Sequence, residues 1–317
     1  MRADARRVLV LVLAVAGLSG AHGLAQEAAA VDTVALRHAT EASYAAGDYA
    51  KALASAEALR DALDAERIDV LYRIAGLHAL LGRKEQAYAA LQQAFDAGFW
   101  DFAGLRKNDD FKSIRDEERF RAMARKAWSA QYIAMLERDE REEFQKPAQV
   151  METLAFRPGE RVADVGAGSG YFTVRVARAV GPTGWVLAID IRQEMLDYVA
   201  ARLASEKIGN VRLSLVQPED PQLPPGGIDT VLMVDTIHYV KDLPAYAKKL
   251  RPGLAEGGRV VIIDYRPKPW AERPWGPPPE QQVPRERIDE AMAAAGLKPV
   301  RAHEFLPEQY FVEYAIR

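Results

Sequence analysis

The segment 162–173, which reads VADVGAGSGYFT, constrains the fold more than any other part of the 317-residue sequence. It opens with an apolar run of the length of a short buried strand. Gly166, Gly168 and Gly170 follow at every second position, and the residues after them have helical spacing. Glycines let a backbone turn tightly and let a ligand approach it, and a helix start offers free N–H groups. The segment predicts a nucleotide-type site; the alternative is a glycine turn without a ligand.

The glycine spacing differs from the dinucleotide fingerprint G-x-G-x-x-G. The third glycine comes one residue early, Tyr171 stands where that fingerprint has glycine, and Asp164 lies just before the first glycine. The string resembles the first motif of class I S-adenosylmethionine (AdoMet) methyltransferases, whose loop backbone holds the methionine part of AdoMet. The resemblance implies AdoMet as the cofactor, bound here by Asp164, Gly166, Ala167, Gly168 and Gly170.

The resemblance covers about residues 145–317, where strand and helix patterns alternate. It implies an α/β fold, a Rossmann-like methyltransferase sheet of seven mostly parallel strands flanked by helices. The expected strands are 162–165, 185–189, 211–216, 228–234, 259–264, 300–305 and 310–316. The last two resemble the final antiparallel hairpin of these enzymes, whose last strand inserts into the sheet.

Acidic residues follow two of the expected strands. Asp190 comes 22 residues after Gly168, close to the roughly 20 residues expected for an acid that binds ribose hydroxyls. Its carboxylate can accept two hydrogen bonds from a diol, or it can cap the next helix; Ile191 beside it joins the predicted cofactor site. The resemblance also implies an acid against the adenine amino group. Glu219 has the commoner spacing and Asp220 also qualifies, although the neighbouring prolines fit an ordinary turn.

The segment 235–239 follows the fourth strand at its carboxyl end, where ligands bind in open α/β sheets. The resemblance implies the methyl-proximal loop here, with Asp235 at the cofactor and His238 and Tyr239 as the catalytic candidates. His238 can be a general base because its pKa lies near neutrality, but a lone histidine is more often structural. The segment lacks the Asn/Asp-Pro-Pro-Tyr/Phe pattern, which argues against methylation of DNA, RNA or glutamine.

Three further segments bear on the site. Residues 267–284 carry seven of the 18 prolines, so they cannot form a regular element and are either a lid or acceptor wall, or a disordered or packed insertion. The resemblance implies that the segment just before the first strand lies over the AdoMet pocket, which makes Gln145 and Lys146 candidates for ligand contact; a simple helix cap is the alternative. The charged run 138–143, in a helix expected to continue to 143, is predicted to be a solvated face.

Residues 34–126 form an alanine-rich helical region before this domain. Gly47 and Gly82 open similar segments 35 residues apart, close to the tetratricopeptide period of 34. The region therefore resembles a tetratricopeptide-like repeat domain. It is either a docking surface for a protein or peptide, or a helical domain that packs on the enzyme.

Residues 1–25 resemble an export signal, with Arg2, Arg6 and Arg7 before an apolar run at 8–18 that is too short to span a bilayer. The expected location is periplasmic. The alternatives are an uncleaved anchor and a misassigned start of the chain; without an export signal the protein would be cytoplasmic. AdoMet is made in the cytoplasm, so export and methyl transfer stand in tension.

Composition narrows the classes of function. The chain has no cysteine, which excludes disulfides, cysteine metal sites and thiol nucleophiles, and no metal site is expected. The net charge is −3 and no basic block stands out, which argues against a nucleic-acid partner. The sequence predicts a methyltransferase acting on a small-molecule acceptor. The alternative is a catalytically silent AdoMet-fold protein that binds partners through its helical repeats.

Overall fold

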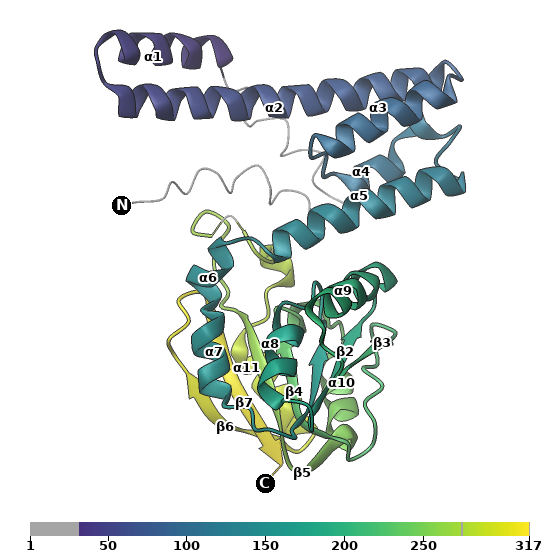
Figure 1. The fold of residues 1–317 in the computed structure, drawn as a ribbon, viewed down its shortest axis with the longest axis vertical. Coiled ribbons are helices and arrows are strands. Elements are labelled where there is room, and N and C mark those ends of the chain that lie inside the picture. Colours follow the sequence, from purple (N-terminus) through teal and green to yellow (C-terminus); the bar gives the residue numbers. More distant parts are fainter. Residues whose placement is uncertain (1–31, 274, 317) are drawn as a thin grey trace. The chain divides into compact units, whose positions relative to one another are not determined.

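The computed structural model describes residues 32–273 and 275–316, and these divide into a helical unit up to Gln131 and an α/β unit from Tyr132 (Figure 1). The predicted export signal at 1–25 lies outside the described residues. No helix in the described part of the chain is both long enough and apolar enough to cross a membrane.

The α/β unit is built on one seven-stranded sheet with the order β3-β2-β1-β4-β5-β7-β6. The strands are β1 Arg161–Val165, β2 Trp185–Asp190, β3 Val211–Leu215, β4 Ile228–Val234, β5 Leu254–Tyr265, β6 Leu297–His303 and β7 Gln309–Ile316. Strands β1 to β5 are parallel, and β7 runs antiparallel to β5 and β6 between them. The predicted sheet, including the inserted last strand, is confirmed.

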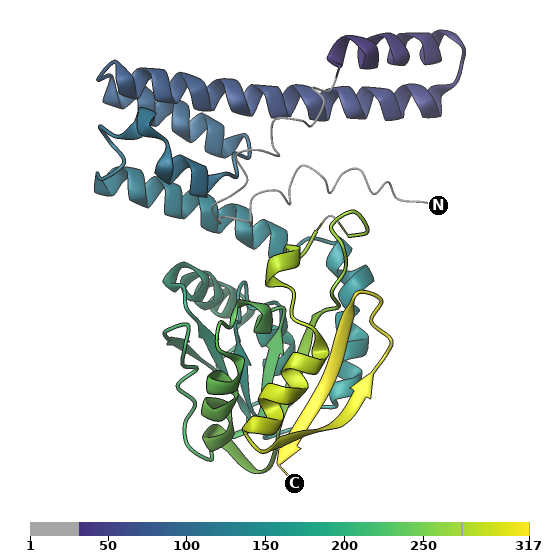
Figure 2. The same ribbon diagram turned by 180° about the vertical axis from the view of Figure 1, so that it is seen from behind.

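Helices cover both faces of this sheet because strand side chains alternate between them. Ala163 and Val165 of β1 pack in one core cluster with α10 Leu243–Leu250 and α11 Arg285–Ala294, which Figure 2 shows in front of the sheet. Val162, whose side chain lies on the other face of the strand, packs with α7 Pro147–Leu154 and α8 Tyr171–Val180 (Figure 1). The remaining elements are α6 Glu140–Gln145, α9 Gln193–Glu206 and the short 3-10 helices η4 Ile237–Tyr239, η5 Arg251–Gly253 and η6 Pro279–Gln281. The predicted α/β architecture thus brings the carboxyl ends of β1, β2, β4 and β5 to one edge.

The helical unit confirms that residues 34–126 are helical. Its helices are α1 Thr33–Ala45, α2 Tyr49–Leu80, α3 Lys84–Asp96, α4 Phe102–Lys107, the 3-10 helix η3 Asp109–Phe111 and α5 Glu118–Leu136, which continues into the α/β unit. Gly47 and Gly82 follow helix ends with φ of +75° and +71°, which explains their recurrence. The helix between them is one continuous helix of 32 residues. The tetratricopeptide-like character of the unit stays a prediction.

Two predictions for the segment before the sheet are wrong. The helix expected to reach residue 143 ends at Leu136, and α6 begins at Glu140. The charged run 138–143 is not wholly solvated, because Arg141 is only 7% exposed. Its guanidinium lies over the ring of Tyr171, 4.1 Å from the centroid, and donates to the carbonyl oxygen of Leu136 at 2.7 Å. The charged run predicts a guanidinium surrounded by water. In the structure the ring of Tyr171 and the carbonyl of Leu136 take the place of that water around Arg141.

Candidate active site

The glycine loop between β1 and α8 is tied to the end of the neighbouring strand β2. The N–H groups of Gly166 and Ala167 both donate to the carbonyl oxygen of Ile189, at 2.8 and 2.9 Å. The N–H of Gly168 donates to Oδ2 of Asp190 at 2.9 Å. The predicted loop and the predicted ribose acid are therefore in direct contact.

Close packing accounts for two of the glycines. A Cβ atom on Gly166 would lie 2.3 Å from Oγ1 of Thr236, in the loop after β4. A Cβ atom on Gly170 would lie 3.1 Å from Cγ2 of Val199 in α9. Both residues also have positive φ, +78° and +77°, a conformation that favours glycine. The missing side chains therefore let the loop touch β4's continuation on one side and α9 on the other.

Asp190 is buried, and backbone donors hold its carboxylate. Oδ1 accepts the N–H of Arg192 at 2.9 Å, while Oδ2 accepts the N–H of Gly168. Burial raises the pKa of Asp190, and hydrogen bonds from the backbone of Gly168, Arg192 and Ile191 oppose that rise. Each carboxylate oxygen can accept more than one hydrogen bond, so a diol can still be bound. The next residue, Ile191, is 49% exposed.

Asp164 is buried near the end of β1, and its contact with the cofactor stays a prediction. Its Oδ2 accepts a hydrogen bond from Oγ1 of Thr173 in α8 at 2.5 Å. Burial raises the pKa of the Asp164 carboxyl to about 6, and the hydrogen bond from Thr173 limits the rise. The residue therefore fastens the end of β1 to the start of α8, and so fixes the shape of the glycine loop between them.

Asp235, directly after β4, is the centre of a buried polar cluster. It accepts hydrogen bonds from Nε2 of Gln145 at 2.9 Å and from Nε2 of Gln309, and Arg141 lies 3.9 Å away. Burial raises the pKa of Asp235 to about 6, although the charge of Arg141 lowers it. The backbone of Asp235 has φ of +53°, an uncommon conformation for a residue with a side chain. Gln145, a candidate for ligand contact, is thus hydrogen-bonded to Asp235, which the resemblance places at the cofactor.

The two catalytic candidates, His238 and Tyr239, form η4 after β4. Nδ1 of His238 lies 2.8 and 3.0 Å from the two carboxylate oxygens of Asp264, near the end of β5. Tyr239 is 48% exposed, its ring centroid lies 4.1 Å from that of His238, and its hydroxyl bonds with Tyr132. Asp264 was not predicted as a site residue. The available signal was an acid at the carboxyl end of an apolar strand, the pattern that identified Asp190.

The remaining candidates lie apart from this group. The side chain of Glu219 is exposed, and within the described chain it makes no hydrogen bond to the glycine loop, Asp190 or Asp235. Its carbonyl accepts from Nζ of Lys249 at 2.8 Å, and Asp220 pairs with the same lysine at 3.4 Å. Lys146 donates to the carbonyl oxygen of Phe305 at 3.0 Å. The structure gives Lys146 and Asp220 structural partners and leaves Glu219 as an untested adenine contact.

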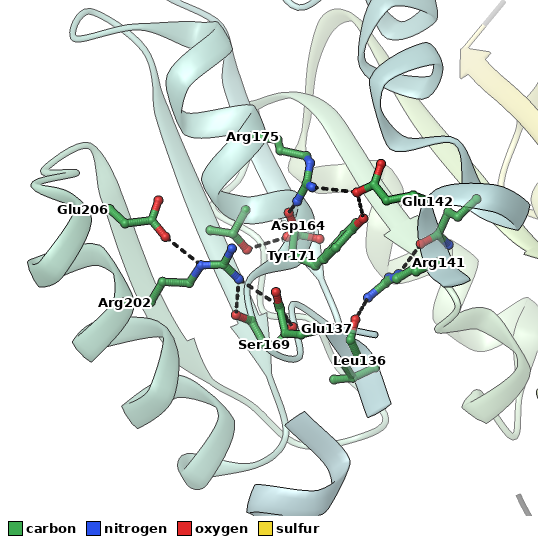
Figure 3. Close-up of polar contacts among 12 residues, drawn as sticks. Leu136, Glu137, Arg141, Glu142, Asp164, Ser169, Tyr171, Arg175, Arg202 and Glu206 are labelled. Carbon is green, nitrogen blue, oxygen red and sulfur yellow. Dashed lines mark hydrogen bonds and ion pairs between the residues drawn. The ribbon is translucent and has the colours of Figure 1, made fainter. Parts of the chain in front are cut away.

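The segment 137–142, which runs from the end of α5 into α6, supplies residues that sequence reasoning missed (Figure 3). Oε1 of Glu137 accepts from Oγ of Ser169 in the glycine loop at 2.5 Å and from Arg202 of α9 at 2.8 Å. Glu142 accepts from the hydroxyl of Tyr171 at 2.5 Å. Figure 3 shows Arg141 and Glu142 on the same side of Tyr171. The segment before the sheet is therefore hydrogen-bonded to Ser169 of the glycine loop and to Tyr171 at the start of α8, and it forms an ion pair with Arg202 of α9.

Comparisons with known proteins agree with this geometry. The family model described as a methyltransferase domain, Methyltransf_31, matches residues 156–296. Nocamycin O-methyltransferase of Saccharothrix syringae is 33% identical over 138 residues, which are 42% of this chain and 49% of that protein. The ubiquinone/menaquinone biosynthesis C-methyltransferase UbiE of Ectopseudomonas mendocina is 30% identical over 116 residues, 36% of this chain and 45% of that protein. The chain therefore spans about half the length of the curated relatives it matches.

A solved structure extends the similarity to the fold. The S-adenosylmethionine-dependent methyltransferase from Aquifex aeolicus superposes with a TM-score of 0.54 and 26% identity, over 58% of this chain and 97% of that one. The matched family model, the seven-stranded order and the glycine loop agree with one another. The chain therefore contains a class I S-adenosylmethionine-dependent methyltransferase domain.

Proposed function

We propose that the protein transfers a methyl group from AdoMet to a small-molecule acceptor. The observation that carries the proposal is the hydrogen bond from the N–H of Gly168 in the glycine loop to the carboxylate of Asp190. It lies at the carboxyl ends of parallel strands, the position at which such sheets bind ligands. The residues present fit AdoMet: the backbone of Gly166 and Gly168 can approach its methionine part, and the Asp190 carboxylate can accept from its ribose. Ile191 offers an exposed apolar side chain next to that acid.

AdoMet supplies a methyl group that a sulfonium already activates as an electrophile. The chain's tasks are then to align the acceptor and to exclude water. Aromatic rings of Tyr265, Trp275 and Phe144 pack together beside Asp235, with centroids 4.7 to 6.2 Å apart. Trp275 belongs to the proline-rich segment, so this contact supports its role as an acceptor wall. The matched relatives are named for O- and C-methylation, and both names concern small molecules.

Calorimetry tests the proposal. The protein should bind both AdoMet and its demethylated product, and a screen of small-molecule acceptors with radiolabelled AdoMet should give a methylated product. Absence of binding heat with either compound, in a protein whose circular dichroism shows it folded, would contradict the proposal.

The alternative is a catalytically silent protein that binds a protein or peptide through its helical unit. The supporting observation is a set of large apolar side chains that are exposed on α1, α2 and the turn after α2: Tyr44, Tyr49, Leu53, Leu63, Val70, Ile74, Leu77, Leu80 and Leu81. A tetratricopeptide-like domain would use such a surface for docking. AdoMet binding without turnover on any acceptor, together with a partner lost on Leu77→Glu, would favour this alternative.

We further propose that the protein is exported, on the basis of the signal-like residues 1–25. Mass spectrometry of the native protein should then find an N-terminus near Gln26. An intact Met1 in a cytoplasmic fraction would contradict export and remove the tension with the cytoplasmic origin of AdoMet.

A further inference from the structure

His238 and Asp264 form a buried pair whose geometry fixes the protonation of the imidazole. Nδ1 lies within 3.0 Å of both carboxylate oxygens, and both side chains are almost fully buried, at 3% and 2% exposure. A carboxylate only accepts hydrogen bonds, so Nδ1 must carry the proton. In the neutral imidazole Nε2 is then the unprotonated nitrogen, and the described residues give it no hydrogen-bond partner.

Asp264 is itself held by the backbone. Oδ1 accepts the N–H of Tyr265 at 2.7 Å, and Oδ2 accepts the N–H of His238 at 3.4 Å. Both oxygens are therefore engaged, and each also faces Nδ1. The carboxylate cannot rotate without losing these bonds, so it holds the imidazole ring in one orientation.

The pair lies beside the glycine loop. His238 comes two residues after Thr236, whose Oγ1 would be 2.3 Å from a Cβ atom on Gly166. Only the absent side chain of Gly166 allows this approach. The glycine loop and the segment that carries His238 are thus packed directly against each other at the carboxyl ends of β1 and β4.

We propose that His238 and Asp264 act as a base dyad that removes the proton from a hydroxyl group of the acceptor, which makes this an O-methyltransferase of phenols, enols or alcohols. The inference rests on the proposed function. Nε2 of His238 takes the proton, and Asp264 is a positioning residue that fixes the tautomer and stabilises the imidazolium.

The step balances without another reactant. The acceptor O–H bond breaks and its proton passes to Nε2, while the oxygen electron pair forms the new O–CH3 bond. The C–S bond of the sulfonium breaks and its electron pair stays on sulfur, leaving a neutral thioether. The imidazolium then releases the proton to solvent. A carbon, sulfur or tertiary-amine acceptor without a hydroxyl would have no use for the dyad.

The charges around the imidazole suit a base. Burial lowers the pKa of His238, whereas Asp264 and then Asp235 raise it and Arg273 lowers it. The net pKa lies above the usual histidine value. The rings of Tyr239 and Tyr265 also face it. The rate of methyl transfer should therefore rise with pH as the imidazole loses its proton. Asp264→Asn should move that rise to lower pH.

The first experiment reads the tautomer and needs no acceptor. Long-range proton–nitrogen NMR of protein with 15N-labelled histidine, assigned by the loss of one ring in His238→Gln, should show a protonated Nδ1 and a bare Nε2 above the pKa of His238. In Asp264→Asn the amide NH2 faces Nδ1, and the proton should move to Nε2. A proton on Nε2 in the wild type, or an unchanged tautomer in Asp264→Asn, would overturn the proposal.

The second experiment measures transfer to matched acceptors: 4-methylphenol, which is protonated at neutral pH, the more acidic 4-nitrophenol, a primary amine and a thioether. Methylated product should form from hydroxyl acceptors. His238→Gln and Asp264→Asn should lower kcat on 4-methylphenol by roughly 100-fold or more, with a smaller loss on 4-nitrophenol. Equal losses on both phenols, or methylation confined to the amine or thioether, would overturn it.

A second histidine–carboxylate pair provides the control. Nε2 of His303 in β6 lies 2.8 Å from Oε1 of Glu313 in β7, and the strands β5 and β7 separate β6 from β4. His303→Gln should leave kcat and its pH dependence unchanged, even where it lowers the melting temperature. AdoMet affinity, measured by calorimetry, separates a failure of the dyad from a failure of the proposed function. All three variants should bind AdoMet like the wild type. A wild-type protein that does not bind AdoMet contradicts the proposed function and not the dyad.

Discussion

Asp190 is the residue that tests the cofactor site most directly. Asp190→Ala removes two charge-assisted hydrogen bonds to a ribose, each worth about 1.5–3 kcal/mol, so AdoMet affinity should fall at least about tenfold in calorimetry. Asp242 is a control, because its carboxylate too accepts a backbone N–H, that of Ala245 at 3.0 Å, and it is no cofactor candidate. Asp242→Ala should leave the affinity unchanged. An unaltered dissociation constant for Asp190→Ala would end the assignment.

The glycine loop gives a second residue-scale prediction, in which two glycines should behave differently. At Gly166 an added methyl meets Thr236 at 2.3 Å, whereas at Gly168 it meets the flexible end of Leu136 at 3.0 Å. Both have positive φ, so alanine strains both. Gly166→Ala should lower the melting temperature more, and Gly168→Ala should lose most of the AdoMet-induced rise in melting temperature. A Gly168→Ala protein that keeps the wild-type rise would show that the loop is only a turn.

Asp164 predicts a pH dependence of stability. Its pKa is raised by burial to about 6, so the folded protein binds more protons than the unfolded one between about pH 4 and pH 6, and stability falls as pH rises through that window. Asp164→Asn removes this loss and should be more stable at pH 7, by up to about 3 kcal/mol, but not at pH 4. Denaturant titrations at both pH values measure the difference.

Asp229 is the control of opposite sign. A hydrogen bond from Arg161 lowers its pKa, so its ionised form stabilises the fold at neutral pH and that contribution is lost as the pH falls. Asp229→Asn should therefore be less stable than the wild type at pH 7. If Asp164→Asn also destabilises at pH 7 and not at pH 4, the burial argument for Asp164 is wrong.

At the scale of elements, α6 depends on Arg141. This guanidinium holds Leu136, Gln145 and the ring of Tyr171 together and is the nearest cation to buried Asp235. Arg141→Met should cost about 3–5 kcal/mol, because it leaves a buried carboxylate without its charge partner. Arg175 is the matched control, since it lies 3.9 Å from the same ring but is 30% exposed. Arg175→Met should cost about 1 kcal/mol or less, and equal losses would contradict the role given to Arg141.

The elements also show what the sequence can and cannot predict. The sheet was predictable because its strands are apolar runs bounded by glycine, proline and acids, and Asp190 was predictable because it follows such a run at a known spacing. Arg141 was not, since burial of a charge inside an acidic and basic run depends on Tyr171, 30 residues away. The partnership of His238 with Asp264 was not either. Both strand ends were predicted, but only the side-by-side placement of β4 and β5 joins the two side chains.

At the scale of the whole molecule, the α/β unit begins at Tyr132, earlier than the residue 145 expected from the resemblance and the residue 156 at which the family match starts. The additional segment contains Glu137, which bonds Ser169 of the glycine loop, and Arg141. These contacts reach the proposed cofactor site from outside the matched domain. The segment is therefore part of the methyltransferase unit and not a linker.

Two fragments test this division. A fragment of residues 127–317 keeps every such contact and should unfold in one transition and bind AdoMet like the full chain. A fragment of residues 144–317 lacks Glu137 and Arg141. Ser169 of its glycine loop then has no Glu137 to donate to, and buried Asp235 has lost its cation. This fragment should therefore melt at a lower temperature and bind AdoMet more weakly. Calorimetry and thermal melts measure both effects. Equal affinity in the two fragments would show that the segment only connects the units, and an unfolded longer fragment would show that the α/β unit needs the helical unit to fold.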